Sequence, residues 1–115
     1  MMFYLTIDAI DYIHEKFKGK NEKPMISIYE ISKQACAGSY LDYYLELTFG
    51  EGIIESELYE RYEEIDDGHG GTIVIYIEKR ILSDFPETGN ILIDIQKTKK
   101  FDDEFISLIL KDSKK

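Results

Sequence analysis

The stretch "YLDYYLELTF", residues 40–49, has the clearest structural pattern in the chain. Apolar side chains recur at every second position, which predicts a strand with one face in the core, because successive side chains of a strand point to opposite faces. The inward set is Leu41, Tyr43, Leu45, Leu47 and Phe49, and the outward set is Tyr40, Asp42, Tyr44, Glu46 and Thr48. A slip of one residue would bury Asp42 and Glu46, so the alternation also fixes the register.

Upstream of this strand, the spacing of apolar residues predicts a helix from Ile7 to Lys18. Its apolar face consists of Ile10, Ile13 and Phe17. Thr6 is placed to cap the first turn, and Gly19 can end the helix in the left-handed conformation. After Pro24, the β-branched and aromatic run at residues 25–31 predicts a strand.

Downstream, the segments Leu58 to Ile65 and Thr72 to Glu78 have the pattern of a hairpin whose turn is "DDGHGG", residues 66–71. We expect the glycines of this turn to supply positive φ values and its acids to stay solvated. The charge of the first arm favours a position at a sheet edge. Residues 78–89 then predict a turn or a short helix, and residues 90–97 another alternating strand.

The last segment, residues 101–111, fits both a helix and a strand, and a strand is favoured because the preceding strands need a partner at their last edge. The order of elements predicts a β-rich α+β fold. In this fold an N-terminal helix packs on a mostly antiparallel β-sandwich or half-barrel. A length of 115 residues fits a single domain over residues 1–115, with residues 111–115 as a disordered tail.

Composition narrows the class of protein. The 23 acidic and 14 basic residues give a formal charge of -9, which argues against nucleic acid and anionic membranes as partners. No apolar run is long enough for a membrane span, and the N-terminus lacks the pattern of a secretory signal. A single cysteine excludes an internal disulfide and favours a reducing cytoplasm. Sequence motifs of conventional enzymes, such as a phosphate loop or a nucleophile elbow, do not occur.

The single cysteine, Cys36, lies in a loop of small residues and is the main candidate site. The predicted binding loop consists of Ala35, Cys36, Ala37, Gly38 and Ser39. Its backbone amides could stabilise a thiolate or bind an anion, which would make Cys36 a reactive thiol or a metal ligand. The alternative is a small buried side chain without chemistry, which is a common role of free cysteine.

Other candidate ligands have less support. His14 lies on the flank of the apolar helix face, and we expect it to be a packed or half-exposed residue. Asp66, Asp67 and His69 stand in a glycine-rich turn, which does not fix the geometry that a metal ion requires. We therefore expect no metal at these positions.

Tyrosines on the outward face of the strand at residues 40–49 fit either a protein interface or ordinary packing within the sheet. Tyr40 and Tyr44 share this face, and tyrosine offers a large contact area at a small loss of side-chain entropy. We expect this face to mediate a homodimer, or contact with another protein.

Three segments together resemble HesB-like proteins, the IscA-like family of A-type iron–sulfur carriers. They are "YLTIDAIDYIHEKFK" (4–18), "PMISIYEISKQACAGSYLDYYLEL" (24–47) and "YIEKRILSDFPETGNILIDIQK" (76–97). The resemblance covers residues 4–97 and implies a HesB-like domain, in which a helix packs on a β-rich sandwich or half-barrel. It also implies binding of iron or an iron–sulfur cluster through three cysteines, one in the mid-chain loop and two near the C-terminus.

Only Cys36 matches this set of three cysteines, and the segment 101–111 contains no thiol. Because iron–sulfur clusters are normally held by four soft ligands, the resemblance implies a non-enzymatic binding or interaction module rather than a cluster carrier. Two alternatives stay open. One is binding of iron or an iron–sulfur cluster by Cys36 shared across a homodimer, and the other is a redox or persulfide-handling thiol.

Overall fold

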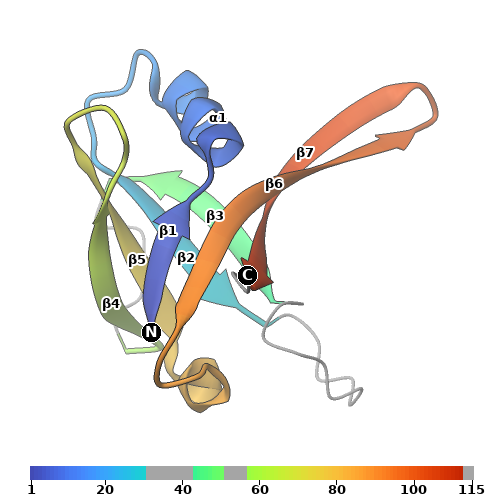
Figure 1. Cartoon of the computed structure of the whole chain (residues 1–115). Helices are drawn as coiled ribbons and strands as arrows, with labels where there is room; N and C mark the ends of the chain where they lie inside the picture. Colours follow the sequence, from blue (N-terminus) through green and yellow to red (C-terminus); the bar gives the residue numbers. More distant parts are fainter. Residues whose placement is uncertain (31–42, 51–56, 113–115) are drawn as a thin grey trace.

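The computed structural model describes residues 1–30, 43–50 and 57–112, and shows two β-sheets and one α-helix (Figure 1). The strands are β1 (Met2–Leu5), β2 (Pro24–Tyr29), β3 (Tyr44–Phe49), β4 (Tyr59–Asp66), β5 (Thr72–Glu78), β6 (Asn90–Lys100) and β7 (Asp103–Asp112). The helices are α1 (Ile7–Phe17) and a 3-10 helix, η3 (Lys79–Asp84). One sheet has the order β1-β6-β7, and the other has the order β3-β2-β5-β4.

The two sheets enclose one apolar core. The first sheet contributes Phe3, Ile91, Ile93, Leu108 and Leu110, and the second contributes Ile26, Ile28, Ile73, Ile75 and Ile77. Each set follows the period of two along its strands, which brings these side chains to one face. Helix α1 adds Ala9 and Ile13 to the same core, at the end of the sheets where Figure 1 places it. The predicted β-rich α+β class is therefore confirmed.

The strand pairing differs in part from the expected one, because each sheet contains a parallel pair. Strand β1 pairs with β6 and β2 pairs with β5 in parallel, whereas the other three pairs are antiparallel. Strand β1 itself was not predicted. It has four residues, of which only Phe3 is buried, so its sequence carries no alternation long enough to recognise.

The predictions for the helix are confirmed within one residue. The Thr6 hydroxyl accepts a hydrogen bond from the Ala9 amide at 3.2 Å, as an N-cap does, and Gly19 has a φ of 79°. The same Thr6 hydroxyl donates to a carboxylate oxygen of Asp94 on β6 at 2.7 Å. Since Asp94 also contacts the Lys111 ammonium at 2.9 Å, this carboxylate joins α1, β6 and β7.

Strand β3 confirms the face predicted for residues 40–49 as far as the structure describes it, which is from Tyr43 onward. Tyr43, Leu45 and Leu47 pack against the core, while Tyr44 and Glu46 are exposed. The two leucines are only half-buried, because β3 is an edge strand. The rest of the predicted strand, residues 40–42, lies outside the described residues.

The remaining strand predictions are largely confirmed. Strands β4 and β5 form the expected antiparallel hairpin, with the charged β4 at the edge of its sheet. The sequence favoured a strand over a helix for the segment 101–111, and this segment forms most of strand β7. However, this strand extends to Asp112, so the prediction of a tail from residue 111 is wrong for Lys111 and Asp112. Pairing with Leu92 and Ile91 on β6 holds these two residues in the sheet.

Candidate functional site

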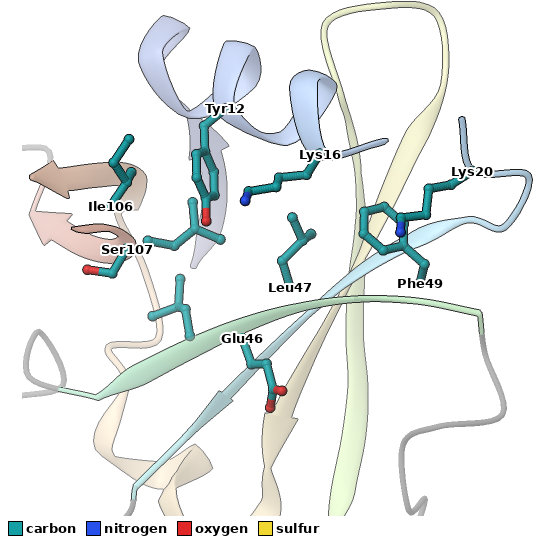
Figure 2. A pocket seen from close by; sticks show the side chains of 10 residues that line it. Tyr12, Lys16, Lys20, Glu46, Leu47, Phe49, Ile106 and Ser107 are labelled. Atoms are coloured by element: carbon teal, nitrogen blue, oxygen red, sulfur yellow. The ribbon is translucent and has the colours of Figure 1, made fainter. Parts of the chain in front are cut away.

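A groove of about 380 Å³ lies where α1, β3 and β7 meet (Figure 2). Its lining consists of Tyr12, Lys16, Lys20, Leu45, Glu46, Leu47, Phe49, Ile106, Ser107 and Leu108. The edge strands β3 and β7 belong to different sheets and contact each other at this point. The groove is therefore built from segments far apart in the sequence.

The apolar part of the groove follows from the strand and helix periods. Leu45, Leu47 and Phe49 project from the core side of β3 toward α1, and their half-burial leaves part of each side chain accessible. Phe49 is also stacked on Phe17 of α1, with 5.7 Å between ring centroids and 13° between ring planes. This stacking fixes the orientation of the Phe49 ring at one end of the groove.

Two lysine ammonium groups lie over the aromatic rings of the groove. The Lys16 ammonium is 5.5 Å from the centre of the Tyr12 ring, and the Lys20 ammonium is 5.2 Å from the centre of the Phe49 ring. Both distances lie within the range of cation–π attraction. Figure 2 shows both lysines on the helix side of the groove, whereas Glu46 projects from the opposite side of β3.

Neither of these lysines forms an ion pair with a residue of the described part of the chain. The ion-paired cations there are Lys18, Lys23, Arg61, Arg80 and Lys111. Lys16 and Lys20 thus keep donor capacity for a ligand, in a protein whose formal charge is -9. An apolar floor beneath two cations suits a ligand that carries both negative charge and apolar surface.

Among the described residues, the ionisable side chains of this groove are two exposed lysines, one tyrosine and the outward-pointing Glu46, which do not form a paired acid and base. Across residues 1–30, 43–50 and 57–112, no group of three or more His, Cys, Asp or Glu side chains is arranged to hold a metal ion.

The predicted binding loop Ala35, Cys36, Ala37, Gly38 and Ser39, together with Tyr40, lies outside the described residues. The flanking residue Tyr43 is anchored: its hydroxyl donates to Asp84, and its ring centroid lies 5.9 Å from that of Phe85. Burial, followed by the hydrogen bond to Asp84, raises the pKa of Tyr43 above its ordinary value of 10.0.

On the other flank, Arg80 donates to the Glu30 carbonyl at 2.7 Å. Tyr44, the second predicted interface residue, is 53% exposed, and its ring lies 6.1 Å from that of Tyr29. The expected outward orientation of Tyr44 is confirmed.

The structure also brings together His14 and His69, which no sequence pattern connects. Their rings stack with centroids 4.0 Å apart and planes 18° apart. The turn between β4 and β5 packs on α1 through this contact. Its Asp66 is exposed, as expected for a solvated acid, whereas Asp67 is half-buried and accepts hydrogen bonds from the His69 and Gly71 amides. The positive φ values expected for its glycines are present at Gly68 (83°) and Gly70 (87°).

Tyr12, Lys16 and Lys20 were not predicted from the sequence as site residues. They recur every four residues, which places Tyr12 and Lys16 in one row along α1 and continues that row toward Lys20. This spacing could have shown a cationic and aromatic row beside the apolar face. The opposite walls, on β3 and β7, could not have been found in this way.

Comparison with known proteins finds no family model that matches the chain, no curated protein with significant similarity in sequence and no solved structure with a significant match. The HesB-like resemblance therefore stays a prediction. No helix in the described part of the chain is long and apolar enough to cross a membrane.

Proposed function

We propose that this protein is a non-enzymatic binding module that holds an acidic, partly apolar segment in the groove between α1, β3 and β7. The observation that carries this proposal is the placement of the Lys16 and Lys20 ammonium groups, which have no ion-pair partner among the described residues, over an aromatic and leucine-rich floor. We infer a cytoplasmic location from the single cysteine.

Both parts of the groove are needed for affinity. The net charge of -9 disfavours the approach of an anion at long range, and salt screens charges beyond about 8 Å. The two lysines therefore act only on a ligand that is already close. Exposed ion pairs contribute about 0.2–1 kcal/mol each, so contact with Leu45, Leu47 and Phe49 must supply the rest.

A hexapeptide of alternating phenylalanine and aspartate is the probe for this proposal. We expect it to bind with a dissociation constant on the order of 100 µM at low salt. The double variant Lys16→Ala, Lys20→Ala should bind about two- to thirtyfold more weakly, because it removes two cations that contribute about 0.2–1 kcal/mol each. Nuclear magnetic resonance titration measures this affinity and locates the contact on α1 and β3.

The matched control is the double variant Lys18→Ala, Lys79→Ala, which changes the net charge equally at exposed positions outside the groove. Its affinity should equal that of the wild-type protein. Equal weakening in both double variants would show that the peptide responds to overall charge, and would refute the groove as its site.

We further propose, on the sequence resemblance alone, that the chain is a divergent HesB-like domain that carries no iron–sulfur cluster. Protein purified without exposure to air should contain neither stoichiometric iron nor acid-labile sulfide, because one thiolate per chain is too few for a cluster. A brown protein that loses its iron in a Cys36→Ser variant would instead establish metal binding by Cys36. A Cys36 thiol with a pKa well below about 8.5, measured by iodoacetamide labelling, would favour the redox alternative.

A further inference from the structure

The hairpin formed by β6 and β7 extends far beyond the core. Figure 1 shows both strands continuing away from the rest of the fold, and every residue from Gln96 to Ser107 is exposed. Regular pairing continues throughout this arm, from Gln96 with Ser107 to Lys100 with Asp103. We call residues 96–107 the arm. A two-stranded hairpin without a buried face is only marginally stable in water, so an arm of this length favours a docked state.

The tip of the arm combines an exposed aromatic ring with charges of both signs, because Lys97, Lys99 and Lys100 precede Phe101 on β6 and acids follow it. Phe101 is 91% exposed, and the residues that follow it are Asp102, Asp103 and Glu104. Phe101 and Asp102 form the two-residue turn with φ values of 52° and 69°. Such turns favour Asn-Gly, and a bulky side chain at positive φ is uncommon. The sequence at the tip is therefore unfavourable for the turn itself, yet it presents a large aromatic side chain to solvent.

The aromatic ring of the tip and the acids that follow it are complementary to the groove, whereas the lysines of the tip lie on the opposite strand, β6. The groove offers an apolar floor and two cations without ion pairs in the described part of the chain, and the tip offers an aromatic ring and three carboxylates. We propose that the arm of one copy docks into the groove of a second copy, with Phe101 against Leu45 and Leu47 and the acids near Lys16 and Lys20. This inference rests on the proposed function, because it names the ligand of the same groove.

The position of the arm allows both copies to make this contact at once. Ile106 and Ser107 at the base of the arm form one wall of the groove. When two arms lie antiparallel, the tip of each reaches the base of the other and hence the partner's groove. This arrangement has two-fold symmetry and makes the same contact twice, as closed dimers do. It is a homodimer that does not use the tyrosine face of β3.

Sedimentation velocity over about a hundredfold range of concentration tests this dimer. The wild-type protein should change from monomer to dimer across the range. The tip variant Phe101→Asn, Asp102→Gly should stay monomeric, and its circular dichroism should be unchanged because Asn-Gly suits the turn. The groove variant Lys16→Glu, Lys20→Glu should also stay monomeric. A monomeric wild-type protein, or a tip variant that still dimerises, would overturn the proposal.

Tyr44→Glu is the matched control, because Tyr44 is exposed on the interface predicted from the sequence. It should leave the dimer intact. Dissociation by Tyr44→Glu together with a dimeric tip variant would assign the dimer to the tyrosine face instead. The aspartate–phenylalanine peptide separates this inference from the proposed function. Binding to the tip variant supports the groove whether or not the arm docks, whereas failure to bind refutes the groove as a site for acidic segments.

Discussion

Replacement of Ile75 by aspartate is expected to unfold the protein at 25 °C. Ile75 is fully buried on β5, where β2 and β4 flank it in the sheet, and its side chain belongs to the core between the two sheets. A carboxylate at this position would lose its hydration without an ion-pair partner, a penalty of several kcal/mol added to the loss of the isoleucine contacts. Because domains of this size are stable by about 5–15 kcal/mol, this change removes most or all of the stability. Circular dichroism and urea titration measure the result.

Two changes on β3 provide the graded control. Leu45→Asp affects a half-buried edge position and should lower the free energy of unfolding by about 1–3 kcal/mol. Glu46→Ala lies on the exposed face and should change it by less than about 0.5 kcal/mol. If all three variants had the same stability, the assignment of inward and outward faces would be wrong.

Asp94→Asn is expected to lower the free energy of unfolding at pH 7 by about 1–3 kcal/mol. The Asp94 side chain is 16% exposed and receives hydrogen bonds from the Thr6 hydroxyl, the Ile95 amide and the Lys111 ammonium. Burial by itself raises the pKa of this carboxyl, but the hydrogen bonds from Lys111 and Thr6 outweigh burial and hold the pKa below its ordinary value of 3.8. The substitution keeps an acceptor for Thr6 and removes the charge opposite Lys111.

The lowered pKa also predicts how stability depends on pH. Because the pKa of Asp94 is lower in the folded state, its carboxylate stabilises the fold above the unfolded-state pKa, and this contribution is lost as the pH falls through the folded-state pKa. The wild-type protein should therefore lose more stability than Asp94→Asn between about pH 6 and about pH 2.5. Asp11→Asn, on the exposed side of α1, should keep the wild-type slope. Parallel slopes for the wild-type protein and Asp94→Asn would contradict this role.

Features that depend on neighbouring residues could be predicted from the sequence. The helix, its Thr6 cap and its end at Gly19 follow from the helical period and from the residue types at the two ends. The β4–β5 hairpin and the inward face of β3 follow from the alternation of apolar side chains. In each case the residues that decide the structure lie within a few positions of one another.

The candidate site depends on contacts that no local pattern contains. The sequence predicted a candidate loop around Cys36, which lies outside the described residues, and it predicted the outward position of Tyr44. It did not predict the groove, whose Lys16, Leu47 and Ser107 come from three elements far apart in the chain.

By itself, then, the sequence determined which faces of the helix and strands are buried, because a periodic pattern records burial at each position. Only the tertiary structure decided which elements meet. Three contacts join residues that lie far apart in the sequence. They are the parallel pairing of β1 with β6, the hydrogen bond from Thr6 to Asp94 and the stacking of His14 on His69. Parallel strands and contacts between layers depend on how whole elements pack, so residue spacing does not encode them. The same holds for the groove, which exists because the edges of two sheets meet beneath one helix.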